Sequence, residues 1–322
     1  MRVAGGVLLL AGVCLAAGPV IFDTDMGNDV DDALALAMLH ALTDRGECRL
    51  IGVTLTNANA SAVPYVQMVN RFFGRGDLPV GAAIRSLKGG AQDGYLSAVL
   101  RNAPAQFRTG GTGAVEPAVT LLRRLLARST DKIVIVQTGF STNLAALLDS
   151  KPDAISPLDG MALAREKVEL VVAMAGDYSG GPPEYNVRID AASAKAVFER
   201  WPTPVIFSGF EIGRDLLYPA AAIERDFRYA KWHPIAESYR AYHKMPYDRP
   251  TWDLTAVLEA VRPEHAYFAR SDAGAVRVDA DGATHFAAGM ADRRYLRLDP
   301  AKRAEILEVL QLLASQPPTR GE

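Results

Sequence analysis

The chain is poor in cysteine, since its 322 residues include only Cys14 and Cys48. Cys14 lies in an N-terminal segment that we expect to be removed, so the mature chain keeps one cysteine and an intrachain disulfide is excluded. The chain also lacks a strong excess of charge, with a formal net charge of −2. Such a balance gives no overall attraction to nucleic acid or to anionic lipid, so we expect neither as a partner.

Beyond its N-terminus the sequence lacks a long apolar segment, so we expect no membrane attachment of the mature chain. The N-terminus itself has one positive charge at Arg2, an apolar stretch over Val3–Ala17 and small residues at the end of that stretch. This arrangement is typical of a secretory signal peptide, which we place at residues 1–18. We therefore expect export to the periplasm or outside the cell. A buried first strand and a membrane anchor are the competing interpretations.

Apolar runs alternate with helical patterns along most of the remaining chain. This order predicts an α/β protein with a mostly parallel open sheet and helices on both faces. No internal repeat or linker is visible, so we expect one large domain over residues 19–322. The predicted strands are Pro19–Phe22, Leu50–Leu55, Lys132–Val136, Val168–Met174 and Pro204–Phe207, and the predicted helices are Asp31–Leu42, Val63–Phe73, Asn143–Leu148 and Ala191–Arg200.

The other segments are less regular. Gly89–Gly113 is rich in glycine and polar residues and is interpreted as a long surface excursion, and Gly176–Pro183 is typical of a substrate-binding loop after a strand. Ala275–Phe286 has the pattern of a hairpin that turns at Asp281-Gly282, and Pro300–Leu313 that of a terminal amphipathic helix.

The most informative segment is Asp23–Asp32, which holds five carboxylates between the first predicted strand and the first predicted helix. Like charges at this density repel one another unless a cation or a proton intervenes. Oxygen ligands suit a hard cation such as Ca²⁺ or Mg²⁺ better than zinc. An aspartate at a helix start is often only a cap, but capping accounts for one or two of these residues and not for five. The segment therefore predicts a metal site.

Five motifs in order along the chain resemble those of the nucleoside hydrolase family, the inosine–uridine-preferring nucleoside N-ribohydrolases. The first is Asp-x-Asp-x-Gly followed by an Asp-Asp pair at the end of the first strand. The resemblance implies a nucleoside-hydrolase-like fold with a Rossmann-like core, a homodimer or homotetramer, and a place in purine or pyrimidine salvage. The other four motifs are Val53–Asn59, Gln137–Leu144, Met174–Gly176 with Glu184–Val187, and Trp252–Ala256.

Carried over residue by residue, the resemblance implies a Ca²⁺ ion and a small-molecule nucleoside substrate. Asp25 would be the general base that activates a water for attack on the N-glycosidic bond. The implied metal ligands are Asp25, Asp32, Asp253 and the main-chain oxygen of Thr138, and the implied substrate-binding residues are Asp31, Asn59, Met174, Glu184 and Asn186. Asp23 would not bind the ion itself but would orient the residues that do.

The sequence departs from the family at two positions. Many members have a histidine immediately before the late aspartate as the acid for the leaving base, whereas this chain has Trp252, which we expect to bind the substrate by stacking on the base. His233, His243 and Tyr247 are the alternative acids. The second departure is the longer loop Asn28-Asp29-Val30, which leaves open that Asp29 replaces Asp31 or Asp32 in the site.

Three other functions fit parts of the pattern. A haloacid-dehalogenase-like phosphatase also begins with Asp-x-Asp after a buried strand and uses Mg²⁺, but it needs a downstream lysine and a later acidic pair that this chain does not supply. A dockerin-like or EF-hand-like loop would hold a structural Ca²⁺, but it completes its own ligand set. An exported protein that binds a nucleoside or sugar without turnover is the third alternative, because Trp252 replaces the expected acid.

Overall fold

The computed structural model describes residues 17–83, 85–89, 93–108, 113 and 115–319. The predicted signal peptide, residues 1–18, therefore lies almost entirely outside the described part of the chain. Among the helices described, none has the length and apolar character needed to span a membrane.

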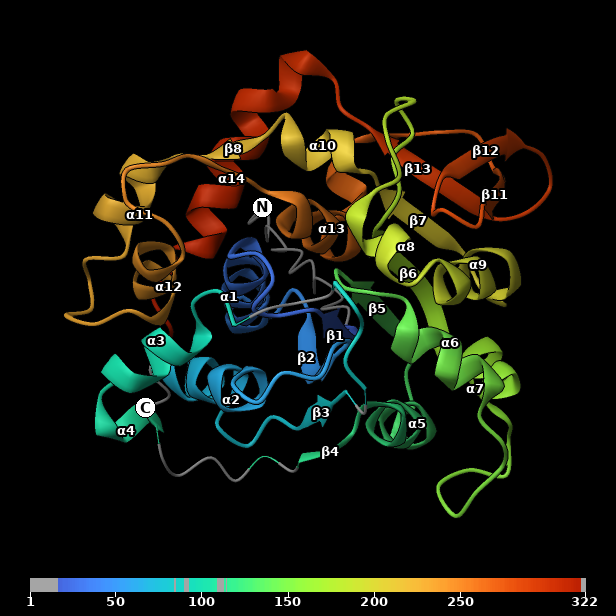
Figure 1. Ribbon diagram of the computed structural model, residues 1–322, viewed down its shortest axis with the longest axis horizontal. Helices are drawn as coiled ribbons and strands as arrows, with labels where there is room; N and C mark the ends of the chain where they lie inside the picture. Colours follow the sequence, from blue (N-terminus) through green and yellow to red (C-terminus); the bar gives the residue numbers. More distant parts are fainter. Residues whose placement is uncertain (1–16, 84, 90–92, 109–112, 114, 320–322) are drawn as a thin grey trace, which may run out of the picture.

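An 11-stranded mixed sheet runs through the described part of the molecule, and most of its strand pairs are parallel (Figure 1). The parallel strands β1 and β5 lie near its middle, and an antiparallel hairpin of β11 and β12 forms one edge. In spatial order the strands are β12 (Thr284–Ala288), β11 (Gly274–Val278), β13 (Arg293–Arg297), β7 (Val205–Ser208), β6 (Val168–Met174), β5 (Ile133–Gln137), β1 (Pro19–Thr24), β2 (Arg49–Leu55), β3 (Val80–Ala82) and β4 (Val115–Pro117), while β10 (Ala269–Arg270) pairs with β13. The short strands β8 (Leu217–Tyr218) and β9 (Arg249–Pro250) pair with each other.

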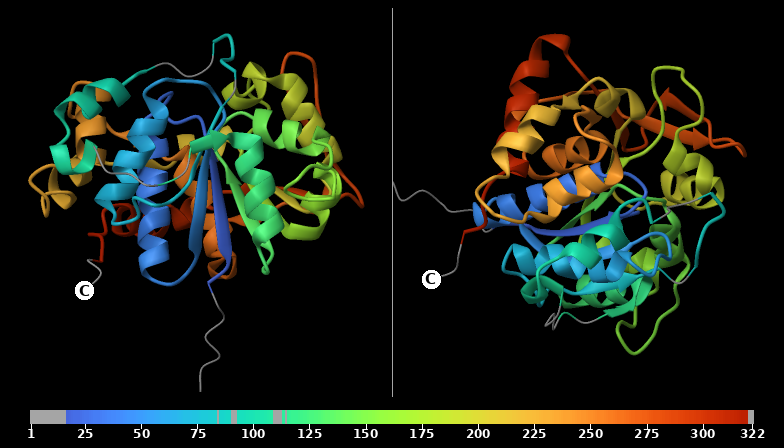
Figure 2. Two further views of the ribbon diagram at one scale, coloured as in Figure 1. Left: turned by 90° about the horizontal axis from the view of Figure 1, so that it is seen from below. Right: turned by 60° about the vertical axis from the view of Figure 1, so that its left-hand side comes forward.

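Helices cover both faces of the sheet, and each face has its own apolar core (Figures 1 and 2). One core is formed with α1 (Asp31–Asp44), α2 (Ala62–Phe72), α12 (Pro234–Tyr242), α13 (Trp252–Val261) and α14 (Arg303–Ala314). The other is formed with α5 (Ala118–Arg128), α6 (Thr142–Asp149), α7 (Gly160–Lys167) and α9 (Ala191–Arg200). The remaining described helices are shorter: α3 (Leu96–Asn102), α4 (Ala105–Arg108), α8 (Tyr185–Ile189), α10 (Phe210–Arg214), α11 (Ala220–Asp226) and the 3₁₀ turns η1 (Pro263–His265) and η2 (Pro300–Lys302).

Helix α1 lies at the centre of the molecule and is buried on all sides. Every residue from Asp31 to Leu42 is inaccessible or nearly so, because α1 packs between the sheet, α13 and α14. A helix whose whole circumference is buried is one that neighbouring elements enclose. This burial fixes the N-terminus of α1, and with it the two aspartates of its first turn, against the end of β1.

The predicted fold class is confirmed, and each predicted strand and helix has a counterpart within a few residues. The hairpin forms as predicted, with Gly282 at a φ of 93° in its turn. The prediction for Gly89–Gly113 is wrong in part, because α3 and α4 form inside it and α3 buries Leu96 and Val99. These helices are too short to show a clear apolar periodicity within a glycine-rich segment. Packing of α3 against α2 and α12, and of α4 against α2, stabilises them.

Candidate active site

A cavity of about 270 Å³ opens where the carboxyl ends of the central parallel strands meet the first turns of α1 and α13. Carboxyl ends of strands in an open α/β sheet are the usual place for a ligand site. Residues that are far apart in the sequence line it together: Asp25, Asn28, Asp29, Asp31, Asp32, Thr138, Met174, Glu184, Tyr185, Asn186, Phe210, Tyr242, Trp252 and Asp253.

Carboxylates crowd one end of this cavity. Oxygens of Asp31, Asp32 and Asp253 all lie within 4.8 Å of one another, and all three residues are buried. The backbone N–H of Asp253 donates to Asp31 at 3.1 Å, which joins α13 to α1 across 222 residues of sequence. Because Asp253 completes the cluster, the Asp23–Asp32 loop is not a self-contained calcium loop.

Asp25 and Thr138 add oxygen atoms at the same end of the cavity. The Oδ2 atom of Asp25 and the Oγ1 atom of Thr138 are buried and have no hydrogen-bond partner. An unpartnered buried polar atom is costly and calls for a ligand. The oxygen-rich set of Asp25, Asp31, Asp32, Thr138 and Asp253 could therefore hold a metal ion, and its donors suit a hard cation.

The electrostatics of the cluster agree with this interpretation. Burial, together with the charges of Asp32 and Asp31, raises the pKa of Asp25 well above its ordinary value. Burial raises the pKa of Asp32 to about 7 although Thr24 donates a hydrogen bond to it, and burial with neighbouring carboxylates raises the pKa of Asp253. Without a cation these groups therefore favour protonation, and a bound cation would reverse that preference.

Asp23, in β1, is linked by hydrogen bonds to residues of β2, α6 and the loop after β5. Its Oδ1 atom accepts from the Thr54 hydroxyl at 2.6 Å and from the Asn143 amide at 2.8 Å, while its main-chain oxygen accepts from Thr138 N at 2.7 Å. A Cβ at Gly139 would lie 2.5 Å from the backbone nitrogen of Asp25. Only glycine allows the loop after β5 to approach β1 this closely.

Of the residues expected to bind ribose, Asp31, Met174, Glu184 and Asn186 line the cavity. The Glu184 carboxylate caps α8 by accepting backbone N–H bonds from Asn186 and Val187, and the Asn186 amide donates to Thr138 O at 2.9 Å. Asn59 is not among the lining residues. Its side-chain oxygen instead accepts from Ser61 N at 2.8 Å, in the turn before α2.

Aromatic side chains also line the cavity, and we call the part lined by Phe210, Trp252 and Tyr242 its aromatic end. Trp252 stacks on Phe210 with ring centroids 5.3 Å apart, and its indole N–H donates to the main-chain oxygen of Phe210 at 2.9 Å. A Cβ at Gly213 would lie 2.4 Å from the Cα of Trp252, so glycine lets α10 and α13 approach each other here. Tyr185 also lines the cavity, and its hydroxyl donates to Asn28 at 3.2 Å.

The alternative acids lie elsewhere. His233 is buried beside α12 with Tyr229 as its partner, His243 is exposed, and the hydroxyl of Tyr247 donates to a main-chain oxygen at 2.8 Å. None of the three lines the cavity. The sequence analysis did not predict Tyr185 or Tyr242 as site residues. Tyr185 lies inside the Glu184–Val187 motif, and Tyr242 lies in residues 232–247, a segment rich in aromatic residues.

Asp29 reaches the cavity from the longer loop, but its carboxylate has another partner. Both of its oxygens accept hydrogen bonds from the Arg249 guanidinium, one of them at 2.9 Å from Nε. Asp31 and Asp32, by contrast, lie in the three-carboxylate cluster with Asp253. This geometry favours the Asp31-Asp32 pair over Asp29 as the acidic pair of the site.

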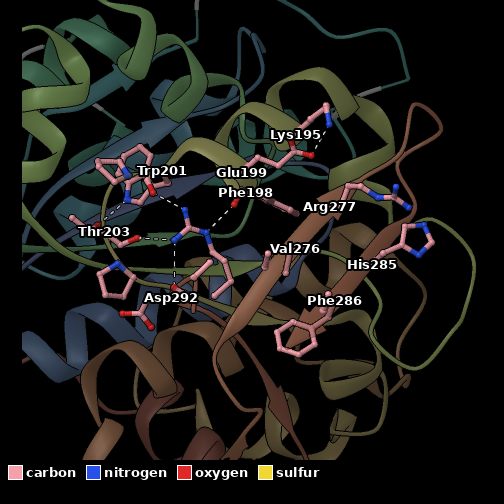
Figure 3. Close-up of a pocket in the computed structure, with 16 residues that line it drawn as sticks. Lys195, Phe198, Glu199, Trp201, Thr203, Val276, Arg277, His285, Phe286 and Asp292 are labelled. Carbon is pink, nitrogen blue, oxygen red and sulfur yellow. Dashed lines mark hydrogen bonds and ion pairs between the residues drawn. The ribbon is translucent and has the colours of Figure 1, made fainter. Parts of the chain in front are cut away.

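A larger cavity of about 820 Å³ lies between α9 and the β11–β12 hairpin (Figure 3), and we call it the hairpin cavity. Its buried cation, Arg293, donates to the main-chain oxygens of Phe198, Thr203 and Trp201, the first at 2.8 Å and the second at 3.1 Å. Lys195 pairs with Glu199 at 2.5 Å. The polar groups of this cavity are thus partnered within the protein.

Comparison with known proteins points to one family. A family model described as inosine-uridine preferring nucleoside hydrolase matches residues 20–312. The chain is 26% identical to the pyrimidine-specific ribonucleoside hydrolase RihA of Enterobacter sp. (strain 638), over 76% of this chain and 80% of the relative. It is 28% identical to the RihA protein of Salmonella enteritidis PT4, over 70% of this chain and 72% of the relative.

Solved structures of nucleoside hydrolases share the fold. A plant nucleoside hydrolase superposes with a TM-score of 0.72 at 21% identity, over 93% of this chain and 99% of that one. An inosine-guanosine nucleoside hydrolase superposes with a TM-score of 0.71 at 17% identity, over 92% and 98% of the two chains. At these identities the likeness concerns the fold alone.

Proposed function

The chain belongs to the inosine-uridine preferring nucleoside hydrolase family, and from this premise we propose that it hydrolyses the N-glycosidic bond of ribonucleosides to free base and ribose. The observation that carries the proposal is a cavity lined both by carboxylates and by aromatic rings. The carboxylates come from the loop after β1 and from the first turns of α1 and α13, and three of them form a close cluster. A ribose with its charged transition state suits the carboxylates, and a planar base suits the rings.

We propose Ca²⁺ as the cation of the acidic end, held by Asp25, Asp32, Asp253 and the main-chain oxygen of Thr138. The raised pKa values of the carboxylates and the unpartnered oxygen of Asp25 support this assignment, and so does the absence of nitrogen and sulfur from the donor set. A bound Ca²⁺ would supply a strong local field that acidifies a water molecule. Asp31 lies close enough to Asp32 and Asp253 to share in the negative charge of the site.

The side chains of this chain perform the rest of the reaction. Asp25 accepts a proton from the attacking water, whose oxygen bonds to C1′ of the ribose. Asp31, Glu184 and Asn186 accept or donate hydrogen bonds to the ribose hydroxyls, and Met174 packs against the sugar. As the C1′–N bond breaks, the ribosyl group gains positive charge, which the surrounding carboxylates stabilise. Trp252 and Phe210 stack on the base.

Family membership leaves the phosphatase and structural calcium-loop alternatives without support. We also propose export through removal of residues 1–18, and assembly into a homodimer or homotetramer. The names of the RihA relatives specify pyrimidine ribonucleosides, so uridine and cytidine belong in any substrate panel beside inosine, guanosine and adenosine.

The test is release of ribose by the purified mature protein from that panel, with Ca²⁺ and with a chelator. We expect chelator-sensitive release that is lost in Asp25→Ala. A well-folded, calcium-loaded protein that releases no ribose from any nucleoside would contradict the proposal. Tight nucleoside binding in that case would point instead to an exported binding protein.

A further inference from the structure

The aromatic end of the cavity poses a charge problem. Among the described residues that line the cavity, the ionisable groups are carboxylates and two tyrosines, and no lysine, arginine or histidine is present. A base that departs with the electrons of the C1′–N bond becomes negatively charged. An acidic cavity resists this charge unless a positive group or a donated proton compensates it.

Arg249 is a cation in direct contact with two of the lining rings. Its guanidinium carbon lies 5.2 Å from the ring centroid of Tyr242 and 5.5 Å from that of Trp252. Nη2 also donates to the Tyr242 hydroxyl at 3.2 Å. Arg249 belongs to the short strand β9, three residues before Trp252, so one segment of chain places both side chains.

Asp29 holds Arg249 in this position. The bidentate contact between the two side chains leaves them only 19% and 23% exposed, respectively. Burial alone would lower the pKa of Arg249, but the hydrogen bonds and charge of Asp29 raise it, so the guanidinium is charged at every physiological pH. A guanidinium that donates two hydrogen bonds to one carboxylate forms one of the more rigid ion-pair geometries. The longer loop Asn28-Asp29-Val30 thus provides the anchor for this cation.

We propose that Arg249, anchored by Asp29, is a positioning residue that makes the aromatic end of the cavity competent to stabilise the departing base. The inference rests on the proposed function. Because the Tyr242 oxygen accepts a hydrogen bond from Arg249, its own proton is free to point at the base and is polarised toward donation. The cation also lies behind the Tyr242 and Trp252 rings, where it attracts negative charge that develops in front of them.

The reaction balances without any further reactant. Water adds its oxygen to C1′ and gives one proton to Asp25, while the electron pair of the C1′–N bond moves to the base nitrogen. The base then takes up a proton from Tyr242, Tyr242 recovers one from solvent and Asp25 releases its proton to solvent, so nucleoside and water become ribose and neutral base. Burial and the charge of Asp29 raise the pKa of Tyr242 to about 12, so the phenol carries its proton at neutral pH.

A simpler role for Arg249 is to neutralise Asp29 next to the other carboxylates. The two roles predict different double mutants. If neutralisation is the whole role, Asp29→Asn restores what Arg249→Gln loses. If the positive charge acts on the base through the rings, the double variant stays as impaired as Arg249→Gln alone.

The experiment compares two substrates on the calcium-loaded mature protein. One is the nucleoside that the wild type hydrolyses best, and the other is 4-nitrophenyl β-D-riboside, whose leaving group departs without a proton. For Arg249→Gln we expect kcat on the nucleoside to fall about 100-fold, in the range for loss of one electrostatic or acid contribution, and kcat on the nitrophenyl riboside to change less than about threefold. Arg249→Lys retains the charge and is expected to recover part of the loss.

Two further variants keep the test decisive. Tyr242→Phe retains the ring and removes the hydroxyl, so we expect a fall of about tenfold that is again confined to the nucleoside. It serves in place of Arg249→Gln if that variant fails to fold, as judged by thermal denaturation. Arg240→Gln is the matched control, because Arg240 is an exposed ion-paired arginine on α12 outside the cavity, and we expect unchanged rates on both substrates.

Equal losses on the two substrates, or recovery in the Asp29→Asn/Arg249→Gln double variant, would overturn the role of Arg249 while leaving the proposed function intact. An unchanged nucleoside rate in Tyr242→Phe would contradict the route through the phenol. If the wild type releases neither ribose nor nitrophenol, the proposed function fails and this inference fails with it.

Discussion

Two of the cavities in the described part of this protein differ in size and, more importantly, in how their polar groups are satisfied. The hairpin cavity measures about 820 Å³ and the acidic cavity about 270 Å³. In the hairpin cavity, the buried guanidinium of Arg293 donates to main-chain oxygens. In the acidic cavity, oxygens of Asp25 and Thr138 are buried without partners.

This difference separates a structural cavity from a reactive one. A cavity whose polar groups are paired within the protein has nothing left with which to bind or activate a ligand, whatever its volume. Unpartnered oxygens and crowded carboxylates in a buried cavity raise the free energy of the folded protein. Binding of a cation and a substrate there lowers it again. The comparison therefore predicts that substitutions in the acidic cavity affect catalysis and that those in the hairpin cavity affect stability or nothing.

The largest effect is expected at Asp25. Asp25→Ala should lower kcat for ribose release by about 10³-fold, because it removes both the general base and an oxygen of the cation site. Asp292→Ala is the matched control, since it removes a carboxylate from the hairpin cavity. Steady-state rates of the two variants test the comparison directly, and a loss of similar size in the control would refute it.

Removal of Ca²⁺ should give the next largest effect, and that effect should depend on pH. The pKa values of Asp23 and Asp32 are raised to about 7 by burial, so the folded metal-free chain binds more protons than the unfolded chain. The contribution of these two carboxyls to stability is therefore fully present below about pH 4 and is lost as the pH rises through about 7. Ca²⁺ at a thousand times its Kd should stabilise the protein by about 4 kcal/mol.

Melting curves with and without chelator at about pH 5 and pH 8 measure this linkage. We expect the gain in Tm on adding Ca²⁺ to be larger at pH 8, where the cation no longer competes with protons. An equal gain at both pH values would show that the carboxylates with raised pKa are not the ligands.

Arg293→Ala should destabilise the fold without changing the chemistry. The substitution leaves main-chain oxygens of Phe198, Trp201 and Thr203 without a buried donor, which should lower the free energy of unfolding by about 2–4 kcal/mol. Urea unfolding measures the loss, and ribose release per folded molecule should stay at the wild-type rate. Arg277→Ala, at an exposed arginine of the same cavity, should leave stability unchanged.

Trp252→Ala should weaken binding of the base. Loss of one stacking surface should raise KM about tenfold, equivalent to about 1.4 kcal/mol, with Trp252→Phe in between. Phe286→Ala removes an aromatic ring from the hairpin cavity and should leave KM as it is. An unchanged KM in Trp252→Ala would mean that the base lies elsewhere.

The smallest effect is expected at Lys195. Its pair with Glu199 lies on the exposed side of α9, and such surface pairs contribute less than about 0.5 kcal/mol. Lys195→Gln should therefore change neither Tm nor ribose release measurably. A clear loss of activity would indicate that the hairpin cavity takes part in function after all.

Much of the fold could be predicted from the sequence because its signals are local. Buried parallel strands appear as continuous apolar runs, and Val168–Met174 and Ala191–Arg200 have the same bounds in the sequence and in the structure. Helices α3 and α4 could not be predicted, since their few apolar residues gain stability only by packing against distant helices.

The sequence by itself determined the acidic loop and its place between a strand and a helix, because periodicity and charge density depend on neighbouring residues alone. It also carried the family resemblance that pointed to Asp253 and Thr138. Only the tertiary structure decided which carboxylates cluster, that Asp29 pairs with Arg249, and that Tyr242 rather than a histidine lines the aromatic end. Those contacts join residues separated by up to 222 positions, and their geometry is set by how α1, α13 and the sheet pack together.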